Sequence, residues 1–279
     1  MGDWNHVNGY LIRPELQYAV EVALTLNKPL LLRGEPGTRK TGLAQAAAQA
    51  LHRPLLVWNL KSDAKANQGL YQYDGVQRLY DSQLLRAAIP GRPRPKDLAA
   101  YLHLGQLGQA FVSDEPVVLL IDGIDKADLD FPGDLLWELE RGQFQIAETG
   151  EIIQAQHPPL VLLTSNGKKE LPAAFLRRCL FYVIPFPEEE EMRAILSVHT
   201  GLEELPSERL DRALDVFYWI RSLTTLQKKP GTSELLDWLR ALTLTEAEPE
   251  GLPYLGTLLK LEGDWEKVRQ YWKGRQHVH

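Results

Sequence analysis

The residues with the clearest chemical potential form one short loop between two apolar segments. The loop follows the apolar run Leu30–Leu32 and precedes an Ala-rich segment that is typical of a helix. A strand, a loop and a helix in this order are the setting of the phosphate-binding pattern G-x-x-x-x-G-K-[ST], and the loop departs from that pattern at one fixed position, Arg39. Its residues are Gly34, Glu35, Pro36, Gly37, Thr38, Arg39, Lys40 and Thr41. The sequence therefore predicts a binding site for the phosphates of a nucleotide, ATP or ADP.

Three kinds of group in this loop favour an anion. Backbone N–H groups at a helix N-terminus have no partner within the helix and carry partial positive charge. Lys40 adds a point charge for the terminal phosphates, and Thr41 adds a hydroxyl for Mg²⁺. Arg39 stands where glycine is usual, so a left-handed backbone at this position would cost about 1–2 kcal/mol, although its guanidinium could fold back onto phosphate. We expect nucleotide binding to be weakened but retained.

A carboxylate at the end of another apolar run completes this chemistry. The run Val117–Ile121 leads directly into Asp122. In nucleotide sites with such a loop, an aspartate at the end of a strand supports Mg²⁺. Many strands end in aspartate at a turn, so Asp122 indicates a metal site only in combination with the phosphate-binding loop earlier in the chain. Thr41 and Asp122 are the predicted metal ligands.

Elements that could position these residues follow from hydrophobic patterning. A helix is expected from Pro14 to near Asn27, and alternation in residues 143–156 predicts a β-hairpin. Residues 60–116 are too long an interval for a plain crossover helix. The apolar runs alternate with helical patterns, which predicts a mostly parallel α/β sheet. Its five expected strands are Leu30–Leu32, Leu55–Trp58, Val117–Ile121, Leu160–Thr164 and Leu180–Ile184.

After Ile184 the pattern becomes helical, and we place a domain boundary there. The predicted domains are an α/β domain over residues 1–186 and a small helical domain over residues 187–279. Asp264 is expected to mark the start of the last helix. The four helices expected in the second domain run from about 188–200, 207–227, 232–244 and 264–274.

Composition limits the class of protein. The chain has 279 residues, a formal net charge of -6 and a sequence pI near 5.7, which argues against broad binding to nucleic acid. One cysteine, Cys179, excludes an internal disulfide. Neither a membrane span nor a signal peptide is recognisable. We therefore expect a cytoplasmic protein without a membrane segment.

With these motifs in order, nearly the whole chain resembles the MoxR group of AAA+ ATPases. The resemblance implies a nucleotide-binding α/β domain with strand order 5-1-4-3-2, a helical lid, and a homo-oligomeric ring, usually a hexamer. It also implies that residues 60–116 contain a helix-2 insert and that residues 143–156 form a pre-sensor-1 hairpin. The stretches that carry it are GEPGTRKT, LLIDGIDKAD, FPGDLLWELERGQF, the hairpin with ETGE, LLTSN and LPAAFLRRC.

The resemblance also implies roles for individual residues. Asn166 looks like sensor 1, and Arg178 looks like the arginine finger given to a neighbouring subunit, with Arg177 as the alternative. In the family a glutamate follows the Walker B aspartate and acts as general base. Gly123 stands at that position here, and Asp125 could in principle replace the missing carboxylate.

Three interpretations follow. The first is a MoxR-like protein that binds nucleotide, assembles, and hydrolyses ATP slowly or not at all. The others are an active ATPase that tolerates Arg39 and Gly123, and a scaffold subunit that no longer uses nucleotide. By the resemblance, the work would be chaperone-like remodelling of protein clients, with a von Willebrand factor A domain protein as a possible partner.

Overall fold

The computed structural model describes residue 4 and residues 12–86, 98–128, 130–197 and 205–276. The chain divides into two compact units. The first contains Ile12–Gly34 and Lys40–Ile184, and the second contains Glu35–Arg39 together with the chain from Pro185 onward. The tip of the predicted phosphate-binding loop is thus grouped with the C-terminal helices.

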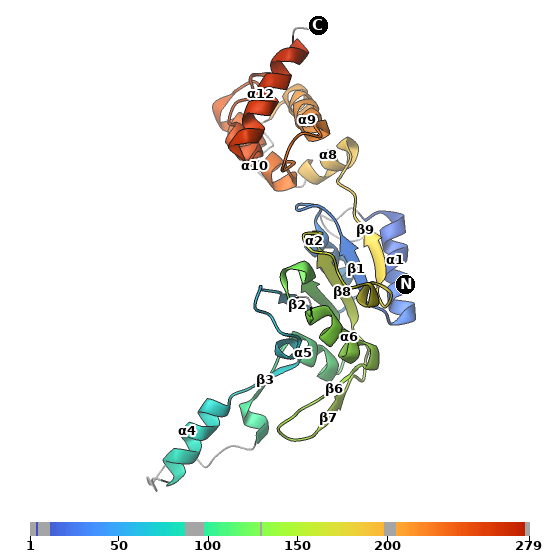
Figure 1. The fold of residues 1–279 in the computed structure, drawn as a ribbon. Coiled ribbons are helices and arrows are strands. Elements are labelled where there is room, and N and C mark those ends of the chain that lie inside the picture. The colour runs from blue at the N-terminus through green and yellow to red at the C-terminus, as the bar shows by residue number, and fades with distance from the viewer. Residues whose placement is uncertain (1–3, 5–11, 87–97, 129, 198–204, 277–279) are drawn as a thin grey trace. The chain divides into compact units, whose positions relative to one another are not determined.

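A five-stranded parallel sheet forms the centre of the first unit (Figure 1). The strands lie in the order β2-β5-β8-β1-β9, which reads 5-1-4-3-2 from the β9 edge when these five are numbered along the chain. Two separate two-stranded sheets in the same unit account for the missing strand numbers. The predicted α/β class is confirmed. The strands are β1 (Leu30–Arg33), β2 (Leu55–Asn59), β5 (Val118–Asp122), β8 (Leu160–Ser165) and β9 (Leu180–Val183).

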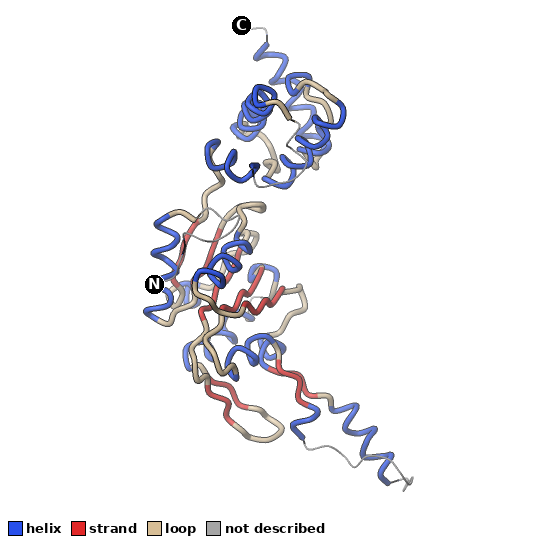
Figure 2. The backbone as a smooth tube through the Cα atoms, turned by 180° about the vertical axis from the view of Figure 1, so that it is seen from behind, coloured by secondary structure: helices blue, strands red, loops and turns tan. Residues whose placement is uncertain are grey.

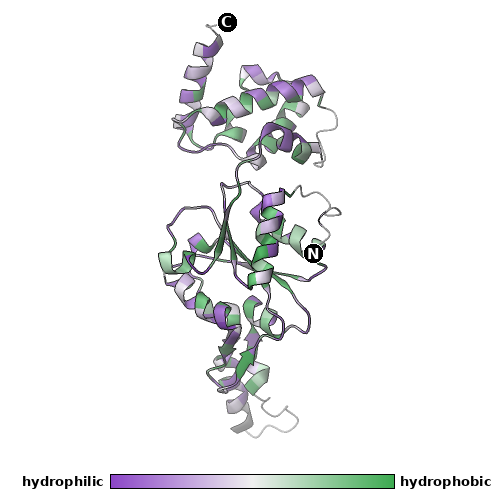
Figure 3. Ribbon diagram, turned by 90° about the vertical axis from the view of Figure 1, so that its right-hand side faces the viewer, coloured by the Kyte–Doolittle hydropathy of each residue, from purple (hydrophilic) through white to green (hydrophobic). Residues whose placement is uncertain are grey.

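The central strands of this sheet form because both of their faces are covered. Every residue of β8 is buried, and Leu30–Leu32 of β1 are at most 1 % exposed. Continuous apolar runs of this kind are what a parallel sheet between helices requires, and the strands are correspondingly hydrophobic in Figure 3. The accompanying helices are α1 (Pro14–Leu26), α2 (Lys40–Ala50), α5 (Gln106–Val112), α6 (Phe131–Arg141) and α7 (Ala173–Leu176).

The first unit also has two small antiparallel sheets of two strands each, separate from the five-stranded sheet (Figure 2). Strands β6 (Gln143–Gln145) and β7 (Ile152–Gln154) form the hairpin predicted for residues 143–156. The long interval 60–116 contains the other two-stranded sheet, formed by β3 (Tyr71–Tyr73) and β4 (Leu102–Leu104). Besides α5, its described helices are α3 (Ala66–Leu70), α4 (Gly75–Arg86) and the 3-10 helix η2 (Leu98–Tyr101).

The second unit is helical, but its helix ends differ from those predicted. The helix expected over 207–227 ends at Ser222, and the end of the one expected over 188–200 lies outside the described residues. No described helix is long and apolar enough to cross a membrane. The elements are α8 (Glu189–Ser197), α9 (Ser207–Ser222), α10 (Thr232–Thr245), η4 (Pro249–Gly251), α11 (Leu255–Leu258) and α12 (Glu262–Gln276).

Asp264 explains one of these differences. The residue lies inside α12 and not at its start, so the predicted cap is wrong. Its carboxylate is 1 % exposed and accepts hydrogen bonds from the backbone N–H groups of Gln227 and Lys228, both at 3.1 Å, and from Lys267 Nζ at 3.2 Å. Burial raises the pKa of Asp264, but these bonds outweigh it and the net pKa is lowered. The carboxylate therefore fixes the turn that replaces the expected last part of α9.

Candidate nucleotide site

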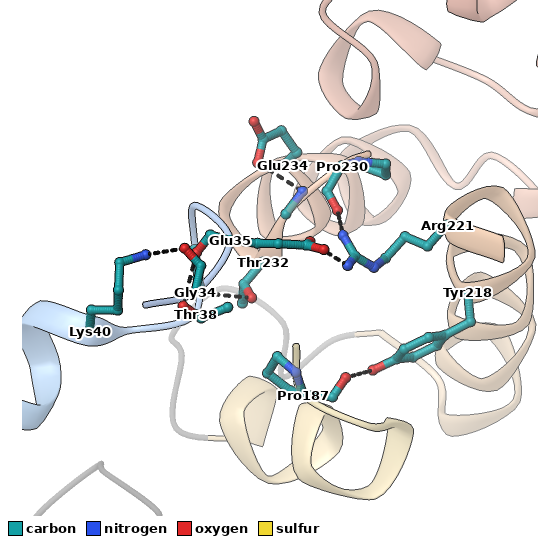
Figure 4. Close-up of polar contacts among 12 residues, drawn as sticks. Gly34, Glu35, Thr38, Lys40, Pro187, Tyr218, Arg221, Pro230, Thr232 and Glu234 are labelled. Atoms are coloured by element: carbon teal, nitrogen blue, oxygen red, sulfur yellow. Dashed lines mark hydrogen bonds and ion pairs between the residues drawn. The ribbon is translucent and has the colours of Figure 1, made fainter. Parts of the chain in front are cut away.

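The two ends of the phosphate-binding loop lie at the carboxyl end of β1. Gly34 follows that strand, and its N–H donates to Ser165 O at the end of β8 at 3.3 Å. Lys40 begins α2, is 7 % exposed, and donates from Nζ to Gly34 O at 2.9 Å (Figure 4). Ligands of open α/β sheets bind outside the carboxyl ends of the strands, so the loop has the expected location.

The tip of the loop, residues 35–39, forms a closed turn. Thr38 donates to Glu35 O twice, from its N–H at 3.3 Å and from its hydroxyl at 2.9 Å. Gly37 has φ +86° and Arg39 has φ +56°. The left-handed backbone considered for Arg39 is therefore present, and it costs a non-glycine residue about 1–2 kcal/mol.

Asp122 is the centre of a second cluster, which joins the end of β5 to β8 and α2. Its Oδ1 accepts from the hydroxyls of Thr164 at 2.7 Å and Thr41 at 3.4 Å. The Thr164 hydroxyl in turn accepts from the N–H of Gly123 at 2.8 Å. The two predicted metal ligands, Thr41 and Asp122, are thus brought together by the fold.

This pair of oxygen donors fits Mg²⁺, which prefers oxygen ligands and usually takes only one or two from the protein, the rest coming from phosphates and water. Across the described part of the chain, no group of three or more His, Cys, Asp and Glu side chains could hold a metal by itself. A magnesium ion here would therefore depend on the phosphates of a bound nucleotide.

Gly123 leaves space that a lysine fills. The residue has φ +80°, and a Cβ built on it would lie 2.5 Å from Lys126 Cε and 2.6 Å from Lys126 Nζ. Lys126 Nζ is 3.8 Å from Asp122 Oδ2. The 3-10 helix η3 (Ile124–Lys126) turns the chain back so that this is possible. Sequence reasoning missed Lys126, although a lysine four residues after a strand-end aspartate is a usable signal.

Asp125 does not replace the missing carboxylate. Its side chain is 3 % exposed, and its two oxygens accept from the backbone N–H groups of Asn166 at 3.3 Å and Lys168 at 3.1 Å. A buried carboxylate bonded in this way fixes the loop after β8 and is not available to water. The substitution considered for Asp125 is therefore contradicted by its geometry.

The other predicted residues occupy two places. Asn166 directly follows β8, next to the Ser165 carbonyl that Gly34 contacts. Arg177 and Arg178 are exposed at the end of α7, where Arg178 Nε lies 3.1 Å from Glu140 Oε1 of α6. Asn166 thus adjoins the loop, whereas Arg178 has a partner on a different helix. The roles suggested for these three residues stay predictions.

Residues 29–179 match the family described as AAA domain (dynein-related subfamily). The matched segment is more than half of the chain, so this protein belongs to that family. The segment includes the whole loop, Asp122, Asn166 and the two arginines that follow α7. Domains of this kind generally bind nucleotide with Mg²⁺.

Among solved structures, a crystal structure of a "putative ATPase" from Cytophaga hutchinsonii is similar to this chain. The two share 13% sequence identity with a TM-score of 0.47, and the alignment covers 95% of this chain and 82% of that one. No curated protein matches the sequence.

Proposed function

We propose that this protein is a MoxR-like AAA+ protein that binds ATP or ADP with Mg²⁺ and hydrolyses ATP slowly or not at all. The observation that carries the proposal is the end of β5, where Asp122 is retained beside Thr41 while Lys126 fills the space at Gly123. Groups that hold phosphate and metal are therefore present. A group that activates water at the position after Asp122 is absent.

The missing base sets the expected rate. A positioned general base typically contributes a factor of about 10²–10⁴ in rate. Glycine has no side chain, and Asp125 is committed to backbone N–H groups. Lys126 brings positive charge and no hydrogen-bond acceptor, because an ammonium group carries donors only. Turnover should therefore lie far below the 1–10³ s⁻¹ of ordinary enzymes.

The wider role is proposed on the resemblance. In this proposal the helices from residue 187 onward act as a lid, and the protein forms a homo-oligomeric ring, most often a hexamer in this family. Arg178, or Arg177, would reach the nucleotide of a neighbouring subunit, for which Arg178 must leave Glu140. Its work would be chaperone-like remodelling of protein clients in the cytoplasm, with a von Willebrand factor A domain protein as partner.

Calorimetric titration with ATP and with ADP in the presence of Mg²⁺ tests the binding. We expect saturable heat for the parent protein and its loss in Lys40→Met, because Lys40 supplies the charge for the terminal phosphates. Lys61→Met, which removes an exposed lysine after β2, is the matched control and should bind like the parent. Absence of heat at millimolar nucleotide would favour the scaffold interpretation. In a separate steady-state assay, phosphate release near 1 s⁻¹ would favour the active ATPase.

A further inference from the structure

Glu35, in the tip of the nucleotide loop, is bound by a buried arginine of the second unit (Figure 4). Arg221 of α9 has a side chain that is 9% exposed, and its Nη2 lies 2.7 Å from Glu35 Oε2. Its Nη1 donates to the carbonyl oxygen of Pro230, and its guanidinium carbon lies 3.3 Å from the centre of the Phe186 ring. The Arg221 guanidinium is therefore held in place by contacts that do not involve Glu35.

The same tip has a second attachment, at Gly37. The hydroxyl of Thr232, at the start of α10, donates to Gly37 O at 3.1 Å. A Cβ on Gly37 would lie 3.1 Å from Thr232 N, and one on Gly231 would lie 3.1 Å from Pro36 O. Glycine on both sides thus lets the two backbones approach closely. The tip is thus bound through the side chain of Glu35, by Arg221, and through the carbonyl oxygen of Gly37, by Thr232.

We propose that Arg221, acting through Glu35, is a positioning residue for the nucleotide loop, so that this ion pair sets nucleotide affinity. The inference rests on the proposed function. The tip is covalently joined to Gly34 and Lys40, so its conformation limits where their polar groups lie. A loop that is already ordered avoids an entropic cost when the ligand binds.

Charge gives a second reason. Glu35 places a carboxylate in a loop that must receive the polyanionic phosphates of a nucleotide. Arg221 neutralises that carboxylate with a short, charge-assisted hydrogen bond. Without Arg221, this negative charge beside the phosphates would no longer be offset by the guanidinium, and the loop would lose the attachment that the ion pair provides. Both effects weaken binding, and both operate only while residue 35 is a glutamate.

A double-mutant cycle separates this role from direct contact with nucleotide. ATP affinity is measured for the parent, Arg221→Met, Glu35→Gln and the double variant by calorimetry with Mg²⁺. We expect Arg221→Met to weaken binding about tenfold, the scale of one charge-assisted hydrogen bond, and to change it less than about twofold when Glu35→Gln is already present. Equal losses in both backgrounds would overturn the proposal, because Arg221 would then act on the phosphates or on the fold itself.

Arg212→Met is the matched control. Arg212 lies on the same helix, α9, and its Nη2 is 2.7 Å from Glu248 Oε2, but its side chain is 47% exposed and its partner precedes η4, outside the nucleotide loop. This variant should bind ATP within about twofold of the parent, since exposed ion pairs contribute little. A tenfold loss of ATP affinity in Arg212→Met would show that breaking any ion pair on α9 weakens binding. That result would overturn the specific role of Arg221.

Hydrogen exchange in the nucleotide-free protein tests the positioning without any ligand. The amide hydrogens of residue 35 and residues 37–39 should exchange faster in Arg221→Met and in Glu35→Gln, because the tip opens more often. Glu35 is half-exposed, so Glu35→Gln tests the pair without disturbing the core. Unchanged exchange in both variants would overturn the proposal. Parent protein that binds no ATP would contradict the proposed function instead, and the exchange result would still decide the role of Arg221.

Discussion

Gly123 and Lys126 determine what the site can do to a bound phosphate. The glycine removes the carboxylate that would activate water, and the lysine side chain lies where that carboxylate would begin. Lys126 and Asp122 are both partly exposed and 3.8 Å apart, so their attraction is worth about 0–1 kcal/mol. Lys126 can therefore yield to Mg²⁺ at Asp122. The missing base is the more serious defect.

Adding a side chain at residue 123 should be costly. Gly123→Ala places a Cβ on a residue with φ +80°, which we expect to lower the free energy of unfolding by about 1–2 kcal/mol. Gly133→Ala is the matched control: a Cβ there has no neighbour within 4 Å, and the residue lies in α6, where alanine is favoured by about 0.5–1 kcal/mol. Denaturant titration measures both. Equal stability of Gly123→Ala and the parent would contradict the strain assigned to this turn.

Arg39 carries strain of the same kind in the loop itself. We expect Arg39→Gly to raise the free energy of unfolding by about 1 kcal/mol and to tighten ATP binding, because glycine adopts φ +56° without penalty. His52→Gly is the control, since His52 has φ +50° outside the loop and should gain stability without a change in affinity. Weaker ATP binding by Arg39→Gly would instead indicate that the guanidinium contacts phosphate.

At the scale of elements, the turn before α10 depends on a carboxylate from α12. Asp264 has a pKa below that of an unfolded aspartate, so its contribution to stability is complete above about pH 4 and is lost as pH falls through the lowered folded pKa. Asp264→Asn should destabilise the protein by about 1.5–3 kcal/mol at neutral pH, and by progressively less below pH 4. Asp237→Asn, at a side chain that is 61% exposed, should have little effect. A pH-independent difference for Asp264→Asn would contradict this account.

The elements show how far sequence reasoning reaches. The five sheet strands could be predicted because each is a short apolar run. The central strands β1, β5 and β8 are almost wholly buried, whereas the edge strands β2 and β9 are only partly buried. The end of α9 could not be predicted. It depends on the turn that follows, which Asp264 fixes by accepting from Gln227 N–H, and Asp264 lies far along the chain from that turn. The role of Asp125 could not be predicted for the same reason: its partners, the N–H groups of Asn166 and Lys168, follow another strand, β8.

At the scale of the whole molecule, the nucleotide loop is shared between two compact units. Its ends belong to the unit that contains the parallel sheet, and its tip belongs to the unit that contains the C-terminal helices. Asp122 and Thr41 can hold a metal without any residue of the second unit, whereas Glu35 and Gly37 are bound by Arg221 and Thr232. We therefore expect nucleotide binding to respond to changes in either unit, whereas the proposed loss of hydrolysis is assigned to Gly123 in the first unit.

The most direct test of retained binding without turnover is to identify the nucleotide that the protein holds. The protein is incubated with radiolabelled ATP and Mg²⁺, separated from free nucleotide, and the bound label is resolved into ATP and ADP over time. We predict that unhydrolysed ATP remains on the protein for many minutes, since the general base that supplies a factor of about 10²–10⁴ is missing. Bound ADP with released phosphate within seconds, or no bound label at all, would contradict the account.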